Sequence, residues 1–145
     1  MGPFTPNRLS NLPNGLDAPV NTTYAIARAT SFTLVGGAAG AAGALGDNGK
    51  INLVTQSGLT ATLPLIATAG QGQAFTFIVV GDAFAFNISP ASTDAITWNG
   101  ASVDNADVYL NASEMQRNNR ITIRSSTSDA WAVSFADGPW RTATV

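Results

Sequence analysis

Carboxylates are the side chains of this sequence that could carry acid–base chemistry near neutral pH, because histidine and cysteine are absent. Asp94, Asp104 and Asp107 fall in predicted loops around one hairpin, and a glycosidase needs a pair of such groups at a fixed separation. Asp104 and Asp107, with Asn105, also offer oxygen ligands for calcium, but without the spacing of an EF-hand loop. Because loop aspartates most often accept hydrogen bonds in turns, we predict no catalytic residue, no metal site and no cofactor.

The missing residue types also exclude whole classes of function. Without histidine and cysteine there is no Ser–His–Asp or Cys–His catalysis, no zinc finger and no disulfide framework. The glycine-rich segment 35–40 follows a predicted strand, as a dinucleotide-binding loop does. It lacks the G-x-G-x-x-G pattern and the amphipathic helix that must follow it. We therefore predict that the protein is not an enzyme.

Three tryptophans are the candidates for stacking on a sugar ring. Trp131 alternates with Val133 and Phe135 along one predicted strand, a spacing that places all three side chains on one face and is typical of a core strand. Trp98 ends a strand at a hairpin and Trp140 lies near the end of the sequence, so either position allows an exposed ring. We expect packing in the core or at an interface as their main role, with contact to a glycan as the alternative.

From residue 22 onward the sequence is typical of β-structure. Alternating apolar and polar residues, β-branched and aromatic side chains, and frequent turn signals indicate a sandwich, barrel or jelly roll. We predict an all-β fold, a compact β-sandwich or barrel-like knob of short antiparallel strands. A turn near 112–118, with Ser113 as its cap, is the one helical candidate. Strands are expected at 23–28, 31–35, 50–54, 58–64, 74–80, 84–88, 96–98, 101–103, 108–110, 120–124 and 130–135.

Residues 74–80 form the strongest predicted strand and the expected centre of a sheet. Phe75, Phe77 and Val79 should share one face, and Ile78 and Val80 the other, because side chains alternate along a strand. Apolar residues on both faces predict a strand that is covered on both sides.

Residues 1–21 differ from the rest and are predicted to form an extended amino-terminal arm before a β-rich domain at 22–145. Several prolines in this segment prevent a helix or a central strand. Phe4, Leu9, Leu12 and Leu16 are spaced along the arm as apolar anchors, which suits docking into a groove of a partner protein. The alternative is an arm that packs against its own domain.

Sparse charge is the most unusual feature of the composition. Charged residues make up 11% of the chain, against an average of about 25% in soluble domains. Such a chain has too few charged side chains to cover the surface of a free monomer in the usual way, so we expect a homo-oligomer. The formal net charge of -2 argues against nucleic-acid binding. The most apolar stretch, 31–46, is shorter than a membrane-spanning helix and is interrupted by glycine, so no membrane contact is expected.

The order of the strand motifs resembles small decoration proteins, also called auxiliary or cement proteins, of tailed-phage heads. A "G-x-T-x-x-LP" strand, an "F-x-F-x-V" strand and a late W-x-V strand follow one another in those proteins. The likeness covers about residues 47 to 135, and the start of the chain is loosely similar as well. The matching segments are Asp47–Lys50, Gly58–Pro64, Phe75–Val80, Ile96–Gly100, Ile121–Ile123, Ala130–Val133 and Pro6–Asn11.

The resemblance implies a homo-oligomeric, often trimeric, β-rich knob bound to the major capsid protein on the outer surface of a bacteriophage virion. The predicted function is therefore a viral structural protein that decorates and stabilises a capsid, with Phe4, Leu9, Leu12 and Leu16 as the capsid-binding residues. The alternative is a phage fibre or tail module that recognises a glycan on the host surface.

Overall fold

The computed structural model describes residues 25–37, 46–91, 93–98, 101–103 and 108–144. The predicted arm lies outside these residues, so its boundary at 21 stays a prediction. One short helix, α1 (Ile66–Ala69), interrupts the series of strands. The strands are β1 (Ala25–Arg28), β2 (Phe32–Thr33), β3 (Ile51–Val54), β4 (Leu59–Thr62), β5 (Ala74–Val79), β6 (Phe84–Ser89), β7 (Ala95–Trp98), β8 (Ala101–Val103), β9 (Val108–Met115), β10 (Arg120–Ser125), β11 (Ala130–Asp137) and β12 (Arg141–Thr144).

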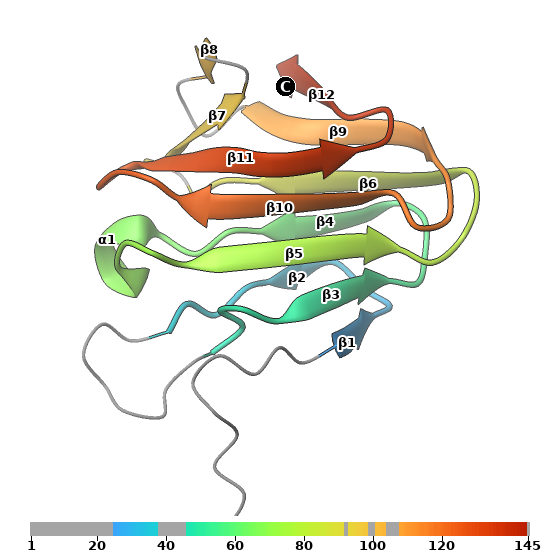
Figure 1. Cartoon of the computed structure of the whole chain (residues 1–145), viewed down its shortest axis with the longest axis horizontal. Helices are drawn as coiled ribbons and strands as arrows, with labels where there is room; N and C mark the ends of the chain where they lie inside the picture. Colours follow the sequence, from blue (N-terminus) through green and yellow to red (C-terminus); the bar gives the residue numbers. More distant parts are fainter. Residues whose placement is uncertain (1–24, 38–45, 92, 99–100, 104–107, 145) are drawn as a thin grey trace, which may run out of the picture.

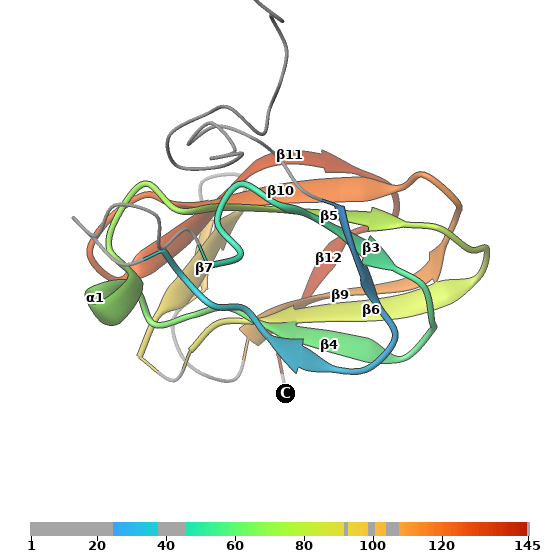
Figure 2. The ribbon, with the colours of Figure 1, turned by 90° about the horizontal axis from the view of Figure 1, so that it is seen from below.

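The strands form two sheets that face each other. One sheet has seven strands in the order β1-β3-β5-β10-β11-β7-β8, and the other has five in the order β12-β9-β6-β4-β2. In Figure 1 the seven-stranded sheet lies in front, with α1 at one end. Figure 2 shows the two sheets edge-on as two layers. The predicted all-β class is confirmed.

The first half of the chain winds back and forth between the two sheets. Each strand from β1 to β6 lies in the opposite sheet from the strand before it, so β1, β3 and β5 pair in parallel, as do β2, β4 and β6. The prediction of antiparallel strands is therefore wrong for this half. Parallel neighbours need a long connection, and here a strand of the other sheet supplies it.

The sequence shows no repeat of fixed length, because the connections between these strands differ in length. Ile51 pairs with Thr76 in one sheet, whereas Phe32 pairs with Ala61 in the other. The two pairs enclose segments of different length, because the loops between the strands are unequal. A search of the sequence for a constant repeat therefore finds none.

The second half of the chain is mostly antiparallel, as predicted. β10 pairs with β5 and β11, and β9 pairs with β6 and β12. β7 and β8 form the hairpin expected from the sequence, in which Trp98 lies opposite Ala101. One pairing departs from this pattern, because β7 joins β11 in parallel.

Aromatic side chains from both sheets fill the space between them. Phe75, Phe77 and Val79 on β5 are 0% exposed, which confirms their predicted common face. The ring of Phe77 lies 5.3 Å from that of Phe86 in the other sheet, and the ring of Phe75 lies 5.5 Å from that of Trp131. Each such side chain contributes roughly 1.5–3 kcal/mol through burial, and each ring pair adds about 0.5–1.5 kcal/mol.

The opposite face of β5 differs from the prediction. Ile78 and Val80 are only half-buried, and no described element covers them. The strand is therefore covered on one side by the five-stranded sheet, whereas the sequence predicted cover on both sides. An apolar sheet face that stays partly exposed commonly marks a site of protein interaction.

The helical turn predicted at 112–118 is wrong, and the helix lies elsewhere. β9 continues to Met115, which pairs with Phe84 of β6. Glu114 and Asn118 adopt positive φ angles of 65° and 71°, which no right-handed helix allows. Pairing of Ala112 and Met115 with β6 overrides the local helix propensity of this segment.

The actual helix, α1, depends on a residue far away in the sequence. Its N-cap residue, Leu65, provides no side-chain hydrogen bond. The amide of Ile66 instead donates to Asp94 Oδ2 at 2.9 Å, and the indole Nε1–H of Trp131 donates to the same oxygen at 3.2 Å. Asp94 is 2% exposed. This buried carboxylate joins α1, the segment before β7 and the core, which is a structural role rather than the catalytic one considered above.

Asp94→Ala should therefore destabilise the fold strongly. The change leaves two buried donors without an acceptor, and each such loss costs about 1–3 kcal/mol. We expect the free energy of unfolding, measured by urea denaturation with an unchanged slope, to fall by roughly 2–5 kcal/mol. Asp94→Asn is the matched control, because its amide oxygen can still accept both bonds. Equal losses for the two variants would contradict this assignment.

Candidate interaction surface

The outer face of the seven-stranded sheet carries apolar side chains where a sheet face in water usually carries polar ones. Period-2 alternation turns Asn52 and Val54 inward, so Ile51 and Leu53 on β3 point outward. A 3.0 Å contact between the hydroxyl groups of Thr76 and Thr122 marks the same outer side on β5 and β10.

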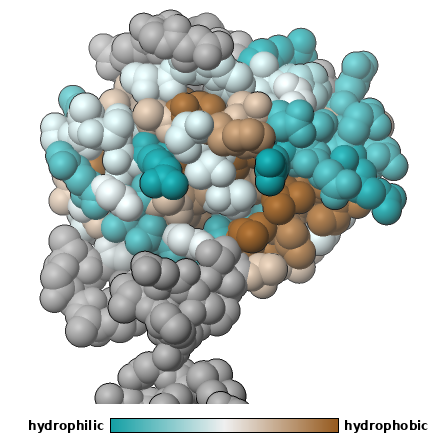
Figure 3. Space-filling view, viewed as in Figure 1, coloured by the Kyte–Doolittle hydropathy of each residue, from teal (hydrophilic) through white to brown (hydrophobic). Residues whose placement is uncertain are grey.

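We call the apolar part of this face the outer patch. In Figure 3 a continuous hydrophobic area lies over β3 and β5. All members of the patch are half-buried or exposed, which distinguishes them from the core. They are Ala25, Ala27, Ile51, Leu53 and Ile78.

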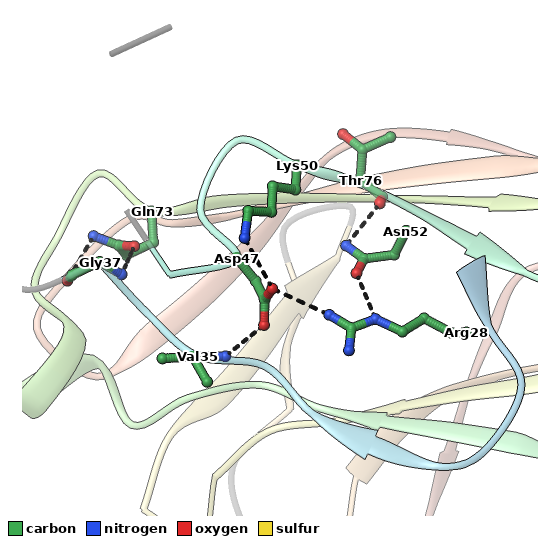
Figure 4. A network of polar contacts seen from close by, with 8 residues as sticks. All are labelled: Arg28, Val35, Gly37, Asp47, Lys50, Asn52, Gln73 and Thr76. Carbon is green, nitrogen blue, oxygen red and sulfur yellow. Dashed lines mark hydrogen bonds and ion pairs between the residues drawn. The ribbon is translucent and has the colours of Figure 1, made fainter. Parts of the chain in front are cut away.

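A polar network fixes the strand that forms the edge of the outer patch. Arg28 on β1 donates from Nε to Asn52 Oδ1 at 3.1 Å, and the Asn52 amide donates to the carbonyl of Thr76 at 3.2 Å. Arg28 Nη2 lies 3.1 Å from Asp47 Oδ1 without hydrogen-bond geometry, so this contact is an ion pair. Lys50 lies 3.5 Å from the same oxygen. The network, drawn in Figure 4, ties β1 to β3 and β5.

The same network satisfies the backbone where the chain crosses between the sheets. Asp47 Oδ2 accepts from the amide of Val35 at 2.9 Å. Gln73 Oε1 accepts from the amide of Gly37 at 2.9 Å, and its Nε2 donates to the carbonyl of Ala69 at 3.1 Å. Asp47 and Gln73 are both buried, so these bonds replace water for backbone groups that have left the sheets.

A β-bulge exposes an aromatic ring next to the outer patch. Thr122 pairs with Phe135 and Ile123 pairs with Val133, which leaves Ser134 as an extra residue in β11. One extra residue inverts the alternation. Trp131 is 0% exposed whereas Phe135 is 43% exposed, so the prediction that they share a core face is wrong.

A hollow of about 330 Å³ opens beside this ring. We call it the Phe135 hollow. Trp98, half-buried, forms one wall. The guanidinium of Arg120 lies 4.5 Å from the ring centre of Phe135, a cation–π contact that holds the ring in place. The hollow is lined by Trp98, Val133, Ser134, Phe135 and Ala136.

The other tryptophans take no part in a described surface site. Trp140 is 8% exposed, and its indole nitrogen donates to the carbonyl of Asp137 at 3.0 Å. An exposed ring, which the sequence allowed at Trp140, is therefore wrong there. Trp131 is buried, as predicted from its strand.

The outer face of the five-stranded sheet is also uncharged over its parallel strands, but it is polar. Thr60 lies opposite Asn87, and Thr62 lies between Thr33 and Ser89. All of these residues are half-buried or exposed, and we call them the threonine face. Rows of hydroxyl and amide groups on a sheet face can form hydrogen bonds across a protein interface.

A second apolar hollow, of about 390 Å³, lies between α1 and the segment that follows β2. Val35, which is 61% exposed, and Leu65 line it. Gly36 lies so close to α1 that an added Cβ would overlap the Cβ of Ala69. Tight packing, rather than a bound nucleotide, explains the glycine at this position.

Most of the site residues predicted from the sequence cannot be placed here. Phe4, Leu9, Leu12 and Leu16, and likewise Asp104 and Asp107, lie outside the described residues. Within the described ranges no group of three or more acidic side chains could hold a metal ion. Among the same residues no helix is long and apolar enough to span a membrane.

The sequence pattern did not identify the residues that form the outer patch and the Phe135 hollow. Ile51 and Leu53 are indistinguishable by pattern from core residues, and the alternation along residues 131–135 predicts Phe135 in the core. In comparisons with known proteins, no protein-family model and no curated protein matches the chain.

The bulge assignment predicts very different costs for two aromatic residues on the same strand. Phe135→Ala should lower the free energy of unfolding by less than about 1 kcal/mol, because the ring is a surface residue with one cation–π partner. Trp131→Ala should lower it by roughly 3–5 kcal/mol, because it leaves a core cavity and removes a donor to Asp94. Similar losses in urea denaturation would place both rings in the core and contradict the bulge.

Proposed function

We propose that the protein is a structural virion protein of a bacteriophage, which decorates and stabilises the outer surface of the capsid by binding the major capsid protein. One observation carries the proposal: the outward positions of the described strands β1 to β6 bear no charged side chain. Two sheet faces that are uncharged over their parallel strands are unusual for a protein that works alone in water, whereas they suit a subunit of a larger assembly.

The positions of the charged side chains in the described residues also support a role in protein contact. Asp47 forms ion pairs with both Arg28 and Lys50 where the chain crosses between the sheets. Arg120 and Arg124 lie on β10, outside the parallel strands, and other charges lie on β11 and in the turns. The parallel strands of both sheets are thus left for protein contact.

The proposed mechanism is mechanical rather than catalytic. A protein that binds across neighbouring capsid subunits recognises only the assembled lattice. Binding then stabilises that assembled state by mass action, to an extent set by concentration over dissociation constant. The arm, with Phe4, Leu9, Leu12 and Leu16, is the proposed capsid contact, and the β-sandwich knob is the part that remains outside.

Deleting residues 1–21 should abolish capsid binding while the knob stays folded. Leu9→Ser combined with Leu12→Ser should weaken co-sedimentation with empty capsids roughly a hundredfold or more, because each buried leucine contributes about 1.5–3 kcal/mol and about 1.4 kcal/mol is a factor of ten. Thr5→Ala and Asn11→Ala are the matched controls and should bind normally. If the truncated chain binds as tightly as the full chain, the arm is not the capsid contact.

We also propose that the protein is a homo-oligomer, with a trimer favoured, and that the threonine face lies between copies. Sedimentation equilibrium at micromolar concentration should then give a mass about three times 14.9 kDa. Thr60→Lys combined with Thr62→Lys should dissociate the assembly, because the contact would bury lysine charges that have no partner. Lysines at the exposed Gln56 and Gln71 are the control. A stable monomer of the unmodified chain would exclude this proposal.

The alternative function, a fibre or tail module that recognises a host glycan, has one specific observation in its favour. The Phe135 hollow presents Trp98 and an exposed ring side by side, and aromatic rings are the usual platform for apolar sugar faces. A glycan array with the purified protein separates the two functions. Binding that is lost in Phe135→Ser would favour the alternative, and an array without signal would favour the capsid protein.

A further inference from the structure

The strand β1 leaves one edge of the seven-stranded sheet without a partner among the described strands. It stands first in the order of that sheet and pairs on one side only, in parallel with β3. In Figure 1 it forms the lower border of the sheet, and no labelled strand lies beyond it. An edge strand of this kind presents free N–H and C=O groups to any extended chain that comes alongside.

The pairing with β3 shows which backbone groups of β1 face outward. The carbonyl oxygen of Arg28 accepts from the amide of Thr55 at 3.1 Å, so the backbone of Arg28 faces β3. Successive residues of a strand direct their N–H and C=O groups to opposite sides. The backbone of Ile26 therefore also faces β3, whereas Ala25 and Ala27 direct their N–H and C=O groups to the free edge. Both alanines are exposed.

β1 lacks the features that usually keep an edge strand from pairing. Natural edges are protected by a very short strand, by proline, by a bulge or by a charged side chain. β1 has four residues, without proline, and its register with β3 is regular. Its one charged side chain, that of Arg28, donates to Asn52 Oδ1 and forms the ion pair with Asp47. The charge is therefore used inside the fold and does not guard the edge.

The other three sheet edges in the described part of the chain are better protected. β2 has two residues and β8 has three. β12 is as long as β1 but carries a charged residue, Arg141, at its start. Among the described strands, β1 is thus the edge most open to an added strand.

The outer patch continues up to this edge. Ala25 and Ala27 belong to the patch and lie opposite Ile51 and Leu53 in the register of β1 with β3. Side chains on the same face of neighbouring strands contact one another. A strand added to β1, with apolar residues at every second position, therefore extends the patch and covers its border while its backbone pairs with the edge.

The place where the arm joins the fold identifies the occupant. Residues 1–24 precede Ala25, the first residue of β1, so a partner that holds the arm is kept at a high local concentration beside this edge. This choice of occupant rests on the proposed function, in which that partner is the major capsid protein. The arm itself is a poor added strand, because no stretch of more than six residues in 1–21 lacks a proline and each proline removes a backbone donor.

We propose that an extended segment of the major capsid protein adds as a strand to the free edge of β1, with hydrogen bonds to Ala25 and Ala27 and with apolar side chains beside the outer patch. In this mode of recognition the backbone bonds supply affinity, and side chains at alternate positions supply specificity. The arm and the edge of β1 are then two separate contacts with one partner, so either contact can be removed without the other.

Ala27→Pro tests the added strand in the full-length chain. The change removes an outward donor, and an edge strand tolerates proline where the N–H faces away from the sheet. We expect an unchanged midpoint in urea denaturation and at least about tenfold weaker co-sedimentation with empty capsids. Ala27→Val, which keeps the amide, is the matched control and should bind normally. Normal capsid binding by folded Ala27→Pro would refute the added strand alone, whereas an unmodified chain that fails to bind capsids would refute the proposed function and this inference together.

Hydrogen exchange tests the same edge without a substitution. In the isolated protein, we expect the amide of Ala27 to exchange rapidly and the amides of Ile26 and Arg28 to be protected. On empty capsids that carry the bound protein, the amide of Ala27 should become protected as well. Protection of Ala27 in the isolated protein would assign the edge to the chain's own arm or to a second copy, and continued rapid exchange on capsids would exclude an added strand. Either result overturns the proposal.

Discussion

The fold depends on supplying hydrogen-bond acceptors to the backbone where the chain crosses between the two sheets. Each crossing takes amide groups out of the strand ladder, and a buried amide without an acceptor destabilises the fold. Asp94, Asp47 and Gln73 meet this need for Ile66, Val35 and Gly37 respectively. These three buried polar residues thus satisfy backbone groups in the crossings from β2 to β3 and from β4 to β5.

The winding also explains how a low content of charge becomes a property of particular surfaces. Because successive strands lie in opposite sheets, every second strand lies side by side in the same sheet, so uncharged outward residues such as Ile51 and Leu53, or Thr60 and Thr62, gather into continuous faces. In one face they are apolar and in the other they carry hydroxyl groups. A composition that looked merely low in charge becomes, in three dimensions, two surfaces suited to protein contact.

A single inserted residue separates the core of the seven-stranded sheet from its exposed aromatic site. Ser134 in the bulge allows β11 to contribute Trp131 to the interior and Phe135 to the surface. The ring then pairs with Arg120 and borders a hollow with Trp98. Bulges commonly re-aim side chains next to binding sites, and here the bulge turns the ring of Phe135 to the surface beside the hollow.

The sequence by itself determined the all-β class, most strand positions and the buried face of β5, because these follow from local alternation and turn residues. Only the tertiary structure decided the parallel pairing, the helix at Ile66–Ala69 capped by Asp94, and the exposure of Phe135. Each of these depends on contacts between residues far apart in the chain. Local patterns carry no record of which strand lies beside which, nor of a bulge that inverts an alternation, so the surface could not be read from the sequence.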